Sequence, residues 1–152
     1  MLTRTKGDLV KAAVDGEINF LVHGCNCFST WGAGIAKQIK AQFPKAYEID
    51  RDDYREPYEK IGSYSSTIIK ETGLRIINLY TQFDYGTNGR KFEYGAFRRA
   101  MDEIYADFYL ENKIIGINRI GSGLAGADFG IVENILLDYT DRGNWILFEW
   151  DK

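Results

Sequence analysis

Two glycine-bearing loops are the segments of this sequence best suited to chemistry. They read Trp31-Gly32-Ala33-Gly34-Ile35-Ala36 and Gly121-Ser122-Gly123-Leu124-Ala125-Gly126. Each lies between an apolar, strand-like run and a helix-like run. Glycine lets the backbone approach an anion closely, and the first turn of a helix offers unpaired N–H groups with a partial positive charge. The two loops therefore predict a site for two phosphates or for one pyrophosphate.

A nicotinamide-dependent enzyme is the first alternative. The second loop matches the pattern G-x-G-x-x-G of dinucleotide-binding folds, and Glu149 could serve as the acidic partner of a ribose. In such folds this loop opens the first strand–helix unit, whereas here only residues 127–152 follow it. We therefore reject this interpretation. A glycine turn that binds no ligand remains the alternative for this second loop.

Other phosphate chemistries lack the residues that they need. The pattern G-x-x-x-x-G-K-[ST] of nucleoside-triphosphate loops is absent. A cysteine phosphatase needs an arginine six residues after its cysteine, where Trp31 and Ala33 stand. The sole histidine is His23, so a metal centre would need His23, Cys25 and Cys27 together, and we favour buried structural thiols instead. We expect neither a metal nor a cofactor.

Length and composition describe an ordinary globular chain. Its 152 residues predict one domain, and 45% hydrophobic and 27% charged residues are typical of water-soluble proteins. No apolar run approaches the roughly 20 residues that cross a bilayer, and the start of the chain lacks a signal peptide, so we expect a cytoplasmic monomer without membrane contact. The net charge of −3 argues against stable nucleic-acid binding and leaves a small phosphorylated ligand as the partner.

Strands and helices are predicted to alternate along the chain. Apolar runs predict buried strands at 18–22, 67–69, 74–80, 114–120 and 145–148, with a further strand at 2–6. Apolar residues at helical spacing predict helices at 35–43, 97–108 and 131–136. This alternation predicts an α/β fold with three layers and a mainly parallel sheet. Ligands bind such sheets at the carboxyl ends of strands, where both glycine loops and segments 7–9 and 80–82 fall.

Four motifs, in order along the chain, resemble those of macro domains. They are Gly7-Asp8-Leu9, His23-Gly24-Cys25-Asn26-Cys27, the loop from Trp31 to Ala36, and Arg119-Ile120 followed by the loop from Gly121 to Gly126. The resemblance covers residues 1–152 as a single macro domain. It is strongest to the small stand-alone branch that includes the ADP-ribose 1″-phosphate phosphatases. It implies a three-layer α/β/α fold with a mixed, mainly parallel sheet, and ADP-ribose or its 1″-phosphate as ligand.

The resemblance also implies a role for individual residues. Asp8 would accept a hydrogen bond from the adenine amino group, Leu9 would orient the ring, and Asn26 would contact the distal ribose. The two glycine loops would grip the diphosphate from opposite sides. The remaining expected ligand-binding residues are Gly7, Gly24, Cys25, Tyr80, Thr81, Gln82, Ile120 and Phe148. Two alternatives stay open, namely that Asp8 only caps a helix and that Phe148 is a core aromatic residue.

In an enzyme, bonds would break at the distal ribose. His23 has the ordinary pKa best suited to proton transfer near neutral pH, and Asp128 could orient a water molecule. The alternatives are a His23 that is hydrogen bonded at a strand end and an Asp128 that caps the helix at 131–136. Hydrolases that release ADP-ribose from glutamate carry a lysine and an aspartate where Gln82 and Ala125 align, so that route should be impaired.

Three functions therefore remain. The chain could be a phosphatase acting on ADP-ribose 1″-phosphate, a hydrolase that removes ADP-ribose from a modified protein or nucleic acid, or a non-catalytic ADP-ribose reader. The phosphatase is our prediction.

Overall fold

The computed structural model describes residues 1–86 and 88–149. Its strands are β1 (Leu2–Thr5), β2 (Phe20–Cys25), β3 (Tyr64–Ile69), β4 (Leu74–Tyr80), β5 (Ile114–Asn118) and β6 (Asn144–Phe148). They form one sheet in the order β1-β6-β5-β2-β4-β3. The β3–β4 pair is antiparallel and the other pairs are parallel. This arrangement confirms the predicted mixed, mainly parallel sheet.

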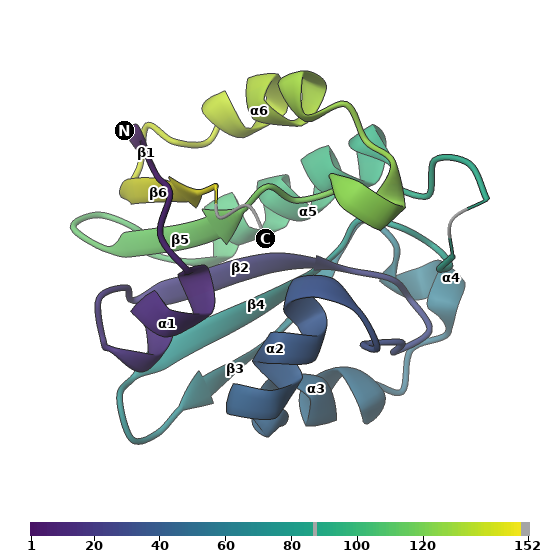
Figure 1. The fold of residues 1–152 in the computed structure, drawn as a ribbon, viewed down its shortest axis with the longest axis horizontal. Helices are drawn as coiled ribbons and strands as arrows, with labels where there is room; N and C mark the ends of the chain where they lie inside the picture. Colours follow the sequence, from purple (N-terminus) through teal and green to yellow (C-terminus); the bar gives the residue numbers. More distant parts are fainter. Residues whose placement is uncertain (87, 150–152) are drawn as a thin grey trace.

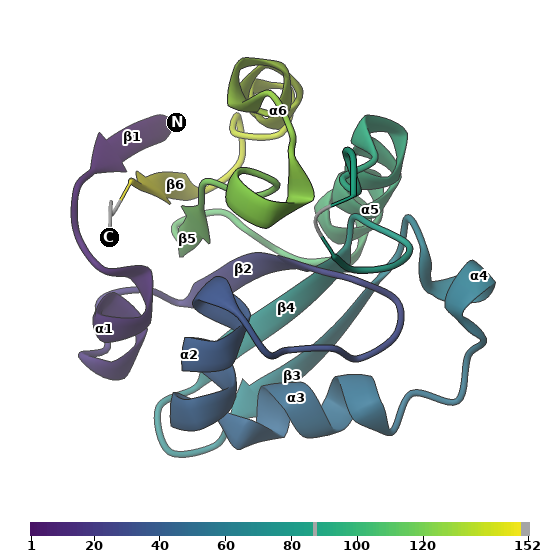
Figure 2. The same ribbon diagram turned by 45° about the vertical axis from the view of Figure 1, so that its right-hand side comes forward.

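Helices cover both faces of the sheet (Figure 1, Figure 2). They are α1 (Leu9–Val14), α2 (Gly34–Gln42), α3 (Pro44–Arg51), α4 (Pro57–Lys60), α5 (Tyr94–Asp107), α6 (Phe129–Leu137) and the short 3₁₀ helix η1 (Gly123–Ala125). The three predicted helices correspond to α2, α5 and α6. The short helices α1, α3 and α4 were not predicted, because so few turns give little apolar periodicity. Among the described residues, no helix is long and apolar enough to cross a membrane.

Strand alternation divides the core between the two faces. One apolar cluster packs Val22, Ile77 and Ile117 against α5 and α6. The other packs Leu21 and Ile76 of the sheet against α1, α2 and α3. Because side chains along a strand alternate between the faces, His23 and Cys25 share the face of Leu21. The side chain of His23 is therefore directed into the layer of α1, α2 and α3.

Candidate functional site

A cavity of about 730 Å³ lies at the carboxyl ends of the parallel strands. Loops that follow β1, β2, β4 and β5 supply most of its lining, and the rest comes from the start of α1, from α2 and from the ends of β2, β5 and β6. The lining residues are Asp8, Leu9, Gly24, Ala33, Gly34, Ile35, Ala36, Gln38, Thr81, Gln82, Asn118, Arg119, Ile120, Gly121, Ser122, Gly123, Ala125 and Phe148. Both glycine loops and two further loops thus meet at one place.

A second cavity of about 320 Å³ adjoins the first. The two share five lining residues: Gly24, Ala33, Ala36, Gln82 and Ala125. The lining of the second cavity is completed by Cys25, Asn26, Thr30, Trp31, Gly32, Tyr85 and Gly86. We call the two together the cleft, with Asp8 and Phe148 at one end and Asn26 and Trp31 at the other. Among its described lining residues, the charged side chains are Asp8 and Arg119.

Helix beginnings face the middle of the cleft. Residues 34–36, in the first turn of α2, and residue 123, at the start of η1, line it, and N–H groups in a first helical turn have no partner within the helix. The conformation of the second loop requires glycine at Gly121. Its φ is +81°, and a Cβ there would lie 2.6 Å from Cδ2 of Phe92. These features make the middle of the cleft suitable for an anion.

Asp8 lies at one end of the cleft and also caps α1. Its Oδ1 accepts hydrogen bonds from the backbone N–H groups of Val10 (3.0 Å) and Lys11 (3.2 Å). Within the described part of the chain, Oδ2 accepts no hydrogen bond. The helix-cap alternative is therefore correct in structural terms, and it leaves one carboxylate oxygen for a ligand. Phe148 also lines this end and is 8% exposed.

Asn26 lies at the other end, where its side chain holds its own loop together. Nδ2 donates to the carbonyl of Thr30 at 2.9 Å, and Oδ1 accepts from the N–H groups of Phe28 (2.8 Å) and Thr30 (3.3 Å). The side chain is mostly occupied by these bonds and the residue is 8% exposed. Asn26 therefore shapes this end of the cleft as well as lining it.

The two cysteine thiols are buried and free. Burial raises the pKa of Cys27 to about 12 and raises the pKa of Cys25 well above its ordinary value. A thiol with a raised pKa forms little thiolate near neutral pH, and the thiolate is the reactive form. In addition, no group of three or more His, Cys, Asp or Glu side chains within residues 1–86 and 88–149 is arranged to hold a metal ion.

His23 is fully buried and is not part of the cleft lining. Its Nε2 forms a 2.7 Å hydrogen bond with Oδ1 of Asn78, and its ring packs edge to face against Trp31 with the centroids 5.0 Å apart. Burial lowers the pKa of His23 from 6.5 to about 4. This position and this pKa do not fit the expected general acid, general base or cationic clamp. The geometry instead matches the alternative of a hydrogen-bonded histidine near the end of a strand, here β2.

Asp128 caps α6, as the alternative interpretation of this residue predicts. Its Oδ1 accepts a 2.9 Å hydrogen bond from the N–H of Gly130, and the residue is exposed outside the cleft lining. Its position outside the cleft lining distinguishes it from Asp8, which caps α1 and also lines the cleft. The geometry therefore gives no support to a water-orienting role for Asp128.

Known proteins resemble this chain in sequence and in fold. No model of a protein family matches it. An uncharacterised 17.5 kDa protein of Enterobacteria phage T4 is 35% identical over 153 residues, which cover 96% of this chain and 94% of that protein. An ADP-ribose 1″-phosphate phosphatase of Saccharomyces cerevisiae strain YJM789 is 42% identical over 62 residues, which cover 41% of this chain and 32% of the phosphatase.

Solved structures share nearly the whole fold. The macrodomain of Mycobacterium tuberculosis DarG superposes with a TM-score of 0.76 at 20% identity and covers 99% of both chains. The Thermosipho africanus DarTG protein in complex with ADP-ribose gives a TM-score of 0.82 at 17% identity, over 99% of this chain and 42% of that one. This chain belongs to the macrodomain family.

Most residues expected to bind the ligand line the cleft of this macrodomain, and a few do not. Gly7 lines a third cavity of about 450 Å³, which shares Asp8 and Phe148 with the cleft. Tyr80 is buried, and its hydroxyl donates a 2.7 Å hydrogen bond to Asp50 beneath the cleft. Gly126 ends η1 and lies against Arg90. The side chain of Leu124 lies outside the described residues. Ligand contact by any of these residues remains a prediction.

Six lining residues were not predicted as ligand contacts. They are Gln38, Asn118 and Arg119 in the first cavity and Thr30, Tyr85 and Gly86 in the second. Asn118 and Arg119 lie near the carboxyl end of the strand predicted at 114–120, and β5 itself ends at Asn118. The rule that ligands bind at the carboxyl ends of strands could therefore have identified them. The other four have no comparable signal in the sequence.

Proposed function

We propose that this macrodomain binds ADP-ribose. One observation carries the proposal: a single cleft joins a carboxylate and an aromatic ring at one end, helix N-termini in the middle, and an uncharged cavity at the other end. Its larger part, about 730 Å³, is within the usual range for small-molecule sites, roughly 300–1,000 Å³. The structural similarity to a DarTG protein solved with ADP-ribose supports this ligand.

The ligand would extend along the cleft in one direction. Adenine would lie between Asp8 and Phe148, with its amino group donating to the free Oδ2 of Asp8. The diphosphate would lie against the N–H groups at the start of α2 and η1, which favour negative charge. The distal ribose would then enter the second cavity beside Asn26 and Trp31. This order rests on Asp8, whose carboxylate can accept from the adenine amino group, because the other end of the cleft has no charged side chain among its described residues.

We further propose that the reaction is hydrolysis of ADP-ribose 1″-phosphate. A water oxygen would attack the phosphorus, the bond from phosphorus to the 1″ oxygen would break, and that oxygen would leave with ADP-ribose and take up a proton. Backbone N–H groups of the two glycine loops would stabilise the equatorial phosphate oxygens. The partial match to ADP-ribose 1″-phosphate phosphatases supports this substrate.

Proton transfer in this reaction would depend on water and on the phosphate itself. The described lining of the second cavity contains no carboxylate, histidine, lysine or arginine, and its one thiol, Cys25, has a raised pKa. General acid–base catalysis by a side chain is typically worth about 10²–10⁴-fold in rate. We therefore expect slow turnover.

The lining of the second cavity also favours one further candidate, a non-catalytic ADP-ribose reader. A cleft end whose described lining holds no carboxylate, histidine, lysine or arginine is sufficient for binding and lacks the groups that most often speed proton transfer. The reader and the phosphatase share the ligand and differ only in turnover.

Two measurements on one preparation test these proposals. Calorimetry with ADP-ribose tests binding, and release of inorganic phosphate from ADP-ribose 1″-phosphate tests the reaction. Binding with phosphate release supports the phosphatase, and binding without release supports the reader. If ADP-ribose does not bind, the proposed function is wrong.

A further inference from the structure

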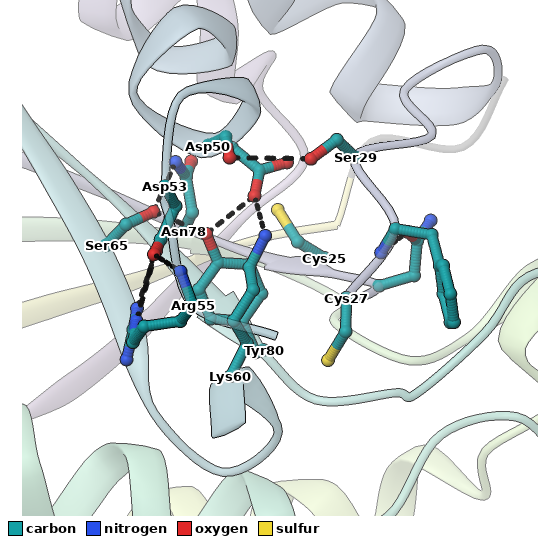
Figure 3. Close-up of polar contacts among 12 residues, drawn as sticks. Cys25, Cys27, Ser29, Asp50, Asp53, Arg55, Lys60, Ser65, Asn78 and Tyr80 are labelled. Carbon is teal, nitrogen blue, oxygen red and sulfur yellow. Dashed lines mark hydrogen bonds and ion pairs between the residues drawn. The ribbon is translucent and has the colours of Figure 1, made fainter. Parts of the chain in front are cut away.

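A buried ion pair lies beneath the cleft, in the layer formed by α3 and α4. Asp50, in the last turn of α3, is 0% exposed, and the side chain of Lys60, at the end of α4, is 4% exposed. Nζ of Lys60 lies 2.7 Å from Oδ1 of Asp50 (Figure 3). Ion pairs so deeply buried add little net stability, because both charges lose their hydration. Stability alone therefore does not explain this pair.

The Asp50 carboxylate also contacts residues that reach the cleft. Its Oδ1 accepts a 2.7 Å hydrogen bond from the hydroxyl of Tyr80, as Figure 3 shows. Its Oδ2 accepts a 2.7 Å hydrogen bond from Nε1 of Trp31. Lys60 and Tyr80 thus hold one oxygen of the carboxylate, and the other oxygen is directed at the indole.

Trp31 connects this buried group to the first glycine loop. It lines the second cavity, directly precedes Gly32 and Ala33, and is only 4% exposed. Its ring packs edge to face against His23 and Tyr47, with centroid distances of 5.0 Å and 5.6 Å. These apolar contacts hold the plane of the ring. The hydrogen bond to Asp50 fixes the direction of its N–H, and a charged acceptor makes such a bond stronger than a neutral one.

Asp50 holds the same loop at a second point. The backbone carbonyl of Asp50 accepts a 3.4 Å hydrogen bond from the hydroxyl of Ser29, also drawn in Figure 3. Ser29 has a φ of +56°, a left-handed conformation that is uncommon for residues other than glycine. A backbone in this conformation needs support from its surroundings. The hydrogen bonds of Ser29 and Trp31 to Asp50 provide that support on either side of Thr30.

We propose that Asp50 is a positioning residue for the proposed ADP-ribose site. Through Trp31 and Ser29, it holds the loop after β2 in the shape that forms the distal-ribose end of the cleft. Lys60 holds the carboxylate in the orientation that this task needs. The inference rests on the proposed function for its ligand, but the hydrogen bond between Trp31 and Asp50 can be tested without any ligand.

Two double variants separate the acceptor from the charge. In Asp50→Asn with Lys60→Met, both charges are lost but position 50 keeps an oxygen that can accept from Trp31. In Asp50→Leu with Lys60→Met, that oxygen is lost as well, while the side chain keeps a similar size. Neither variant leaves an unpaired buried charge, which would by itself be destabilising. The two variants therefore differ in the polar atoms at position 50, which serve both Trp31 and Tyr80.

We expect the asparagine variant to bind ADP-ribose within about threefold of the unmodified chain and the leucine variant to bind about tenfold more weakly or worse, as for a lost hydrogen bond to a buried donor. Both should bind ADP, which lacks the distal ribose, with nearly unchanged affinity. A general loss of stability would instead weaken the binding of ADP and of ADP-ribose alike. Equal ADP-ribose affinity of the two folded variants would overturn the proposal.

A third variant and a control complete the design. Trp31→Phe removes the indole N–H and keeps an aromatic ring. It should show the same selective loss of ADP-ribose affinity, and it tests the proposal even if the leucine variant does not fold. Asp53→Asn weakens the neighbouring ion pair between Asp53 and Arg55. Among the described residues this pair shares no hydrogen bond with Trp31 or Asp50, so both affinities should stay unchanged. A folded Trp31→Phe variant with unchanged ADP-ribose affinity would also contradict the proposal.

Hydrogen exchange of the indole N–H groups tests the hydrogen bond itself. Nε1 of Trp145 donates a 2.8 Å hydrogen bond to the carbonyl of Arg142, far from Asp50 in sequence, and serves as an internal reference. In the leucine variant, exchange at Trp31 should become faster and exchange at Trp145 should not. If the unmodified chain fails to bind ADP-ribose, the proposed function is wrong, and this measurement still decides whether Asp50 fixes the indole. Unchanged exchange at Trp31 would exclude that role.

Discussion

At the scale of single residues, burial decides what the titratable side chains of this macrodomain can do. His23 has the side chain best suited to proton transfer by type, but it lies beneath the cleft with a pKa lowered to about 4. The imidazole is therefore neutral near pH 7 and hydrogen bonded to Asn78. Its contribution is to packing behind Trp31, and this contribution should depend on pH.

Acidification should destabilise the chain through His23. The folded-state pKa lies below the unfolded value of 6.5, so the unfolded chain binds the proton more readily, and stability falls as the pH drops from 6.5 towards 4. Between about pH 7.5 and about pH 5, this effect amounts to about 2 kcal/mol. Urea unfolding at both pH values should show that loss in the unmodified chain and not in His23→Gln. An equal pH dependence in the two proteins would mean that His23 titrates normally.

Asp8 and Asp128 allow capping to be separated from ligand binding. Each carboxylate caps a helix, so Asp8→Ala and Asp128→Ala should each lower the free energy of unfolding by about 1 kcal/mol. Only Asp8 lines the cleft, so only its replacement should weaken ADP-ribose binding, by about tenfold. Calorimetry and thermal unfolding of both variants check this. A matched loss of affinity in Asp128→Ala would place that residue at the ligand after all.

At the scale of elements, the cleft depends on how closely the strand ends approach one another. Gly24, near the end of β2, lies between the loops that follow β4 and β5 and lines both cavities. A Cβ at this position would lie 2.8 Å from both Cγ1 of Ile120 and Oγ1 of Thr81. The absence of a side chain at Gly24 is therefore what lets the two loops meet across β2.

Gly24→Ala should force these loops apart. Overpacking of a well-packed site typically costs about 1–3 kcal/mol, and we expect a loss of that size in the free energy of unfolding, together with weaker ADP-ribose binding. Gly32→Ala is the matched control, because a Cβ there meets no atom within 4 Å. Its stability should change by less than about 0.5 kcal/mol. Denaturant unfolding of both variants measures these free energies. Equal stabilities of Gly24→Ala and Gly32→Ala would show that the loops adjust without cost.

The elements also show why the sequence predicts the fold well and the roles of the site residues less well. The apolar runs and the helical periodicity at Ile35, Ile39 and Phe43 report on burial, which decides strands and long helices. Which face of β2 meets the cleft depends on tertiary packing, so the role expected for His23 was not supported. Asp50 and Lys60 look like residues of solvated helix surfaces, and their burial depends on partners distant in sequence.

At the scale of the whole molecule, the thiols report on opening of the fold. Cys25 and Cys27 are buried at 5% and 2% exposure and have raised pKa values. In native conditions both should therefore react very slowly with a thiol reagent, at a rate set by unfolding. Bound ADP-ribose should slow this reaction further, because a ligand of the folded state lowers the unfolded population. Rapid stoichiometric labelling of the native chain would show that this region opens locally.

The cleft brings together Asp8, near the start of the chain, and Phe148, at the end of the last strand, with β6 placed between β1 and β5. During synthesis on a ribosome, the adenine end of the cleft cannot form until β6 has left the exit tunnel and entered the sheet. A partly synthesised chain would therefore neither capture nor sequester the nucleotide. A chain arrested before β6 should therefore bind ADP-ribose more weakly than the full chain.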